Sequence, residues 1–164
     1  MGISIEDWGN FGAVARSASG ALVGLLFVAI SLNRDRIARH PELRASAAQT
    51  LMVFMLPLII ALLLLTPRQP SRVLGIEIII LGVVHGLGLA MVGHGKPAGE
   101  SNTRLARLVG LITPNMLTTV LVLAAGATVL AGHGNGLYLL VLAIVVALIS
   151  GVANAWLFLI LNPD

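Results

Sequence analysis

Five apolar runs dominate the chain, and each has the length that a bilayer requires. They cover residues 8–33, 43–65, 73–93, 108–131 and 137–161. A transmembrane helix needs about 20 mostly apolar residues at a rise of roughly 1.5 Å per residue. Only 10% of the 164 residues are charged, against about 25% in an average soluble domain. The sequence therefore predicts an all-α integral membrane bundle of five transmembrane helices, forming a single domain over residues 1–164.

The basic residues indicate how this bundle is oriented. The first loop holds Arg34, Arg36, Arg39 and Arg44, the third holds Lys96, Arg104 and Arg107, and the opposite side has Arg16, Arg68 and Arg72. Loops rich in Lys and Arg stay in the cytoplasm. We therefore expect the N-terminus outside, the C-terminus inside, and the bacterial cytoplasmic membrane as the location.

Several kinds of chemistry lack the residues they need. The chain has no cysteine, so it offers no thiolate nucleophile or thiolate metal ligand. No two of its four histidines have the i, i+4 spacing of a helical metal site, and no Gly-x-Ser-x-Gly turn is present. The net charge is only +3, with the basic residues in short loops. We expect no catalytic residue, no metal, no cofactor and no nucleic-acid partner, and therefore no enzyme; membrane lipids are the expected contacts.

Small residues indicate how the helices associate. Lipid tails are as apolar as leucine, so membrane helices associate through close contact of small side chains. Three runs carry such residues four positions apart: Gly20 and Gly24, Gly82 and Gly86, and Ala147 and Gly151. These stripes serve either packing inside one protomer or contact between protomers. A homo-oligomer is the expected assembly.

Two ionisable residues lie within the outer half of the predicted bundle. Arg16 is about eight residues below Trp8, roughly 12 Å deep, and Glu77 is about six residues below Ser71, roughly 9 Å deep. A charge in hydrocarbon costs on the order of 2.5 to 3.5 kcal/mol on insertion scales. The two side chains are therefore expected either to line a water-filled path together or to fix helix register as an ion pair; Glu77 pairing with Arg68 or Arg72 at the surface is the alternative.

Four polar side chains share a level in the inner half. Gln49, His85, Asn115 and Asn154 come from four different helices, each roughly 9 to 12 Å from the cytoplasmic face. They form either interhelical hydrogen bonds or a polar constriction. His85 is the one among them that titrates near physiological pH when unperturbed.

A resemblance concerns the first run only. The segment SGALVGLLFVAISLN at residues 19–33, followed by the arginine-rich loop, is similar to the first helix of small uncharacterised bacterial polytopic membrane proteins. It covers under a quarter of the chain. The resemblance implies a membrane protein and carries no activity, cofactor or site residue.

The sequence leaves three functions open. The first is an oligomeric conduit for protons, ions or a small solute, lined by the two polar layers. The second is a non-catalytic accessory or regulatory subunit that binds a larger membrane complex through its small-residue stripes. The third is an enzyme that acts on lipid or isoprenoid, which lacks a recognisable catalytic constellation here.

Overall fold

The protein is seen in a computed structural model that describes residues 8–93 and 114–160. These residues form helices joined by turns, with no strand among them. The helices are α1 (Gly9–Leu32), α2 (Arg34–Arg39), α3 (Pro41–Leu64), α4 (Ser71–Gly93), α6 (Pro114–Leu130) and α7 (Gly136–Ile160). The all-α prediction is confirmed for this part of the chain. Four helices, α1, α3, α4 and α7, are long and apolar enough to cross a membrane.

The fourth apolar run differs from the other four. Its described part, α6, is an apolar helix of 17 residues, shorter than the four candidate spans. Residues 108–113 of that run lie outside the described residues. So do Lys96, Arg104 and Arg107 of the third loop and the end of the chain after Ile160.

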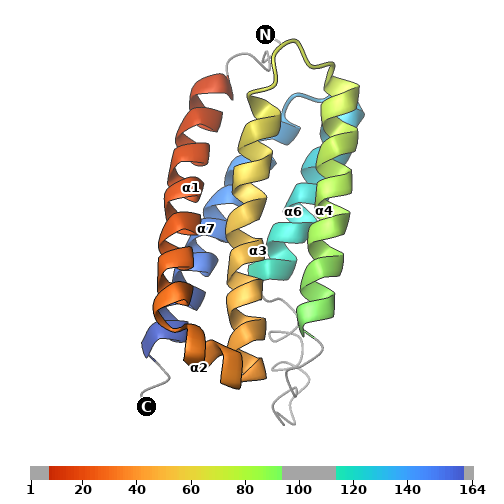
Figure 1. Ribbon diagram of the computed structural model, residues 1–164. Coiled ribbons are helices and arrows are strands. Elements are labelled where there is room, and N and C mark those ends of the chain that lie inside the picture. The colour runs from red at the N-terminus through yellow and green to blue at the C-terminus, as the bar shows by residue number, and fades with distance from the viewer. Residues whose placement is uncertain (1–7, 94–113, 161–164) are drawn as a thin grey trace.

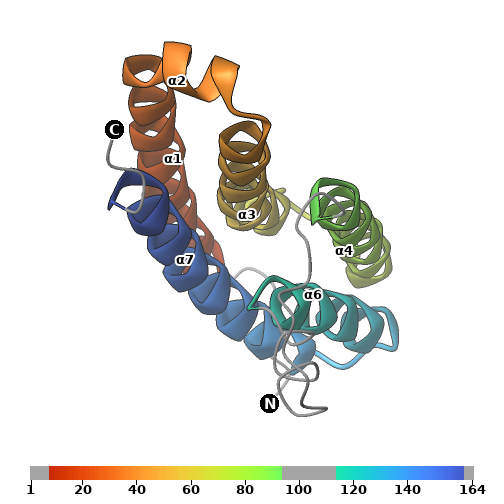
Figure 2. The same ribbon diagram turned by 90° about the horizontal axis from the view of Figure 1, so that it is seen from below.

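The helices run up and down the bundle in chain order (Figure 1). The turn between α3 and α4 and the turn between α6 and α7 lie at one end, together with the start of α1; α2 and the end of α7 lie at the other. Helix α3 packs against α1, α4 and α7, while α6 joins α4 to α7. Seen along the bundle, α3 therefore stands between α1 and α4 (Figure 2).

The turns form where the sequence places helix-breaking residues. Helix α3 ends at Leu64, just before Thr66 and Pro67, and α4 begins directly after Pro70. Between α6 and α7, Gly132 adopts a φ of 82°, which favours glycine because it has no Cβ.

Helix α2 is a feature that the sequence analysis treats only as a basic loop. Asp35 lies in its first turn and Arg36 and Arg39 in its last, where these charges favour the helix dipole. Ile37 is buried and holds the short helix against the bundle. The arginines are therefore displayed on a folded segment.

The bundle has an apolar interior and an apolar exterior. Ile60, Leu74, Ile78 and Leu140 are fully buried in its core. Large apolar side chains also cover the outside, among them Val14, Leu32, Leu87, Met91 and Ile149. Apolar surface of this extent is costly in water and is the normal surface of a helix that faces lipid.

Glycines set the distances between the inner helices. A Cβ built on Gly75 of α4 would lie 2.7 Å from the backbone nitrogen of Leu130 on α6. A Cβ on Gly151 of α7 would collide with the ring of Phe54 on α3. Helices α4 and α6, and α3 and α7, therefore approach as closely as they do because these positions carry no side chain.

Helix α1 uses its small residues differently. A Cβ on Gly20 or Gly24 would meet nothing within 4 Å, and both glycines are exposed. The face of α1 that packs on α3 instead contains Gly12, whose Cβ would lie 3.3 Å from the carbonyl oxygen of Ala61. The stripe at Gly20 and Gly24 is thus open in this protomer.

Candidate functional site

The structure does not bring the two ionisable residues of the outer layer together. Arg16 is exposed on α1, Glu77 is half-buried on α4, and no ion pair joins them. Helix α3 separates the two helices (Figure 2). The shared site expected for Arg16 and Glu77 therefore does not form. An outward arginine near a helix end can extend its guanidinium to lipid headgroups, because its long aliphatic stem tolerates the apolar region.

Glu77 instead has a partner in the turn that precedes its own helix. The side-chain amide of Gln69 donates a hydrogen bond from Nε2 to Oε2 of Glu77. The other amide atom, Oε1 of Gln69, is buried and accepts no hydrogen bond from the described residues. The carboxyl group is thus held where α4 enters the bundle.

Two of the four polar residues of the inner layer lie where α4 packs on α6, and Thr119 links them. His85 of α4 and Asn115 of α6 are both more than nine-tenths buried, with 8% and 6% of their surface exposed. Nδ1 of His85 lies 3.2 Å from Oγ1 of Thr119, which in turn lies 2.9 Å from the main-chain oxygen of Asn115. We call His85, Thr119 and Asn115 the polar seam.

The geometry of the polar seam defines the tautomer of His85. A threonine hydroxyl has one hydrogen, and Thr119 donates it to the carbonyl oxygen of Asn115. The oxygen of Thr119 can then only accept from His85, so Nδ1 carries the hydrogen. In a neutral imidazole the other nitrogen, Nε2, is left as an acceptor.

The other two residues of the inner layer stay outside the polar seam. Gln49 on α3 and Asn154 on α7 are half-buried, and neither makes a side-chain hydrogen bond within the described part of the chain. Of the four polar residues that the sequence predicts at one level, hydrogen bonds therefore connect only the members on α4 and α6.

Thr119 is the member of the polar seam that the sequence analysis missed. Threonines in helices commonly bond the carbonyl four residues earlier, and Thr50 and Thr118 do only that. Thr119 makes this local bond and also contacts His85. The available signal was its position four residues after Asn115, which puts both on one face of the helix.

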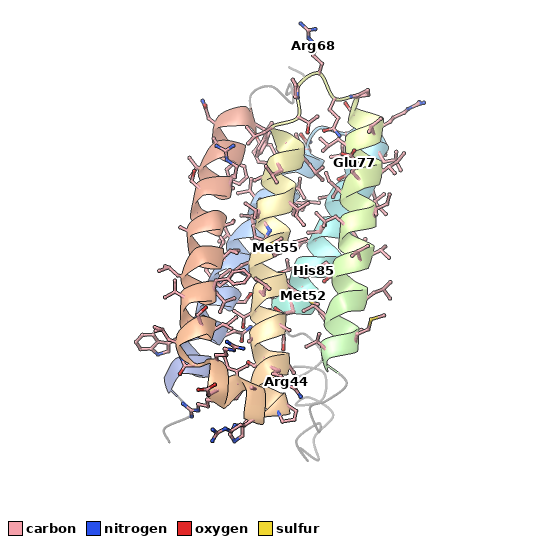
Figure 3. The ribbon with its side chains drawn as sticks, in the orientation of Figure 1. Arg44, Met52, Met55, Arg68, Glu77 and His85 are labelled. Atoms are coloured by element: carbon pink, nitrogen blue, oxygen red, sulfur yellow. The ribbon has the colours of Figure 1, made fainter. Side chains whose placement is uncertain are left out.

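One face of α4 carries both ionisable groups of that helix's buried portion. Glu77, Leu81 and His85 follow at intervals of four residues and so lie on the same side, and we call them the α4 stripe. Figure 3 shows Glu77 near the end of the bundle that holds Arg68, and His85 further along the same helix, at the level of Met52 and Met55. Leu81 between them packs against the apolar core.

The glycines near His85 on α4 are closely packed against neighbouring side chains. A Cβ on Gly82 would lie 2.8 Å from Leu123, and one on Gly86 would lie 3.0 Å from the methyl group of Thr119. On the side of α3, Met52 covers Gly88, with its sulfur 3.3 Å from the position of an added Cβ. The α4 backbone on both sides of His85 is therefore tightly packed.

Metal ligands are sparse at these positions. In residues 8–93 and 114–160, no group of three or more His, Cys, Asp or Glu side chains comes together. Helix α6 carries no ionisable side chain at all. The site offers one imidazole and neutral amide and hydroxyl groups, which suit hydrogen bonding and proton exchange.

Comparisons with other proteins add no family to these observations. No protein-family model, no curated protein and no solved structure matches this chain.

Proposed function

We propose that this protein is an integral membrane protein that conducts protons, ions or a small solute along the α4 stripe. The observation that carries the proposal is the placement of Glu77 and His85 on one face of α4, within the bundle. They are about 12 Å apart along the helix axis, at roughly 1.5 Å per residue. Ionisable groups inside a membrane helix are costly, and they typically mark a pathway or a relay.

The two groups divide the pathway into an outer and an inner portion. Glu77 with Gln69 forms the outer portion, and the polar seam of His85, Thr119 and Asn115 forms the inner portion. Leu81 separates them and packs on the core. The proposed conduit is closed at Leu81, and movement of this side chain is what would connect the two portions.

The proposal includes five crossings of the membrane, with α6 as the fourth. The 17 described residues of α6 span about 26 Å at roughly 1.5 Å per residue, close to the roughly 30 Å of a hydrocarbon core. Helix α6 packs between α4 and α7, which are both long enough to cross. With the basic α2 in the cytoplasm, the N-terminus and the Glu77 end lie outside and the bacterial cytoplasmic membrane is the proposed location.

Flux through reconstituted protein tests the proposal. Purified protein in liposomes should pass protons, ions or a small polar solute, measured with an internal pH dye, by current and by osmotic swelling. Glu77→Gln keeps the shape of the side chain and its contact with Gln69 but removes the charge, and should bring flux down towards that of protein-free liposomes. Asp35→Asn in the exposed α2 is the matched control and should leave flux unchanged. Absence of flux from correctly inserted wild-type protein sinks the proposal.

A second function is favoured by one observation on α1. Gly20 and Gly24 are exposed and open, next to outward-facing Leu25 and Val28. A small-residue stripe that is unused within the protomer suits close contact with another membrane helix. Under this alternative the protein is an accessory subunit of a larger membrane complex, and the same face would also serve a homo-oligomer.

A further inference from the structure

Two buried acceptors at the polar seam lack a donor. Nε2 of His85 and Oδ1 of Asn115 are both inaccessible to solvent, and no donor among residues 8–93 and 114–160 reaches either atom. A buried polar atom without a hydrogen bond is costly, because it has lost its contacts with water and gained no partner in return. Both atoms belong to the polar seam. Their burial without a partner indicates that a hydrogen-bond donor other than the described residues binds there.

The partner must be a donor, and this follows from the tautomer. Nδ1 of His85 already gives its hydrogen to Thr119, so Nε2 has only a lone pair to offer. The amide oxygen of Asn115 likewise only accepts. A molecule with two N–H or O–H hydrogens has the donors that these two atoms require.

The partner must also be neutral and small. Helix α6 supplies no charged side chain, and Glu77 is about 12 Å away along α4 at roughly 1.5 Å per residue. A cation in the seam would therefore be buried without a counter-charge, which is far costlier than a buried neutral donor. Leu123 and Thr119 pack against Gly82 and Gly86, which flank His85 on α4, and this close packing favours a small ligand.

We propose that the polar seam binds one small neutral hydrogen-bond donor, water or ammonia, between Nε2 of His85 and Oδ1 of Asn115. A water molecule occupies about 30 Å³ of liquid volume and commonly makes two to four hydrogen bonds when buried. This molecule would occupy the inner portion of the proposed pathway, so the inference rests on the proposed function. It narrows the transported species to a small neutral donor or to a proton passed along it.

Solid-state NMR of the full chain in lipid bilayers, labelled with ¹⁵N-histidine, tests this binding. The four histidines are distinguished by the signal lost in His85→Gln. We expect Nδ1 of His85 to be protonated and Nε2 to be bare, with magnetisation passing from mobile solvent protons to Nε2. Transfer in ammonium-free buffer identifies water, and transfer that arises only after ammonium chloride is added identifies ammonia.

Two results would overturn the binding proposal: a protonated Nε2 in the neutral ring, or a bare Nε2 that receives no transfer in either buffer. Asn115→Leu removes the second acceptor and should abolish the transfer, whereas Thr118→Val, one turn above Asn115 on the same helix, should retain it. Occupancy and flux are separate readouts. If His85 contacts solvent but the liposomes show no flux, this inference stands and the proposed function is wrong. If the liposomes show flux but His85 has no solvent contact, the proposed function stands and this inference is wrong.

Discussion

His85 on α4 donates from Nδ1 to the hydroxyl oxygen of Thr119 on α6, across 3.2 Å and between segments 34 residues apart in the chain. Thr119→Val keeps the volume but removes the acceptor, leaving the N–H of His85 buried without a partner. We expect a loss of about 1 to 2 kcal/mol in stability, the range of a hydrogen bond between membrane helices together with an unmet donor. Unfolding in mixed micelles measures it.

The matched control for Thr119 is its neighbour. Thr118→Val also removes a buried hydroxyl, but that hydroxyl bonds only the carbonyl of Pro114 in its own helix. This change should be near neutral, because a local bond of this kind adds little to helix stability. Equal losses for the two variants would contradict the interhelical role of Thr119.

Leu81 is predicted to be the barrier of the pathway. Leu81→Ala should raise flux in liposomes, since it shortens the apolar side chain between Glu77 and His85 on the α4 stripe. Ile80→Ala, on the exposed side of the same helix, should leave flux unchanged. Leu140→Ala, fully buried on α7, controls for general loosening of the core. A rise that is the same for Leu81→Ala and Leu140→Ala would argue against a specific barrier.

Gly75 is predicted to limit the approach of α4 to α6. Gly75→Ala places a methyl group against the backbone of Leu130, which cannot move aside as a flexible side chain can. Overpacking of this kind costs about 1 to 3 kcal/mol. Gly20→Ala has open space and should be neutral or slightly stabilising, because alanine favours helix more than glycine does. Thermal denaturation of the two variants side by side decides the point.

The open stripe on α1 predicts an effect on association rather than on folding. Gly20→Leu together with Gly24→Leu should weaken self-association or partner capture, since bulk replaces the surface that permits close approach. Native mass spectrometry in mild detergent measures the protomer count. Val84→Leu, on the exposed side of α4, is the control for added bulk at an exposed apolar position. An unchanged assembly in the double variant would remove α1 as the interface.

The chain contains no cysteine, so a single introduced cysteine can report on which side of the membrane its position lies. Asn135→Cys, in the turn before α7, should react with a membrane-impermeant maleimide added to intact cells. Ala38→Cys in α2 should react only after the membrane is opened. Both positions are exposed, so access depends on the side of the membrane. Labelling of both from outside would contradict the proposed topology.

The sequence by itself determined the helical class and most helix ends. Apolar runs of sufficient length force helices, because backbone groups in hydrocarbon must bond within their own segment. Pro67, Pro70 and Gly132 then stop or turn the chain wherever a helix cannot continue. Such signals are local, and so they can be read one segment at a time. The sequence did not predict the short helix α2, because charged side chains dominate its six residues and it contains no long apolar run.

Only the tertiary structure decided which polar groups meet. Depth counting put Arg16 level with Glu77, but depth leaves the direction of each side chain around its helix undetermined, and α3 lies between the two helices. The same count grouped His85 with Asn115 and gave no indication that Thr119 joins them. The close contact of α4 with α6 made that connection, because glycines at the seam bring the two backbones together.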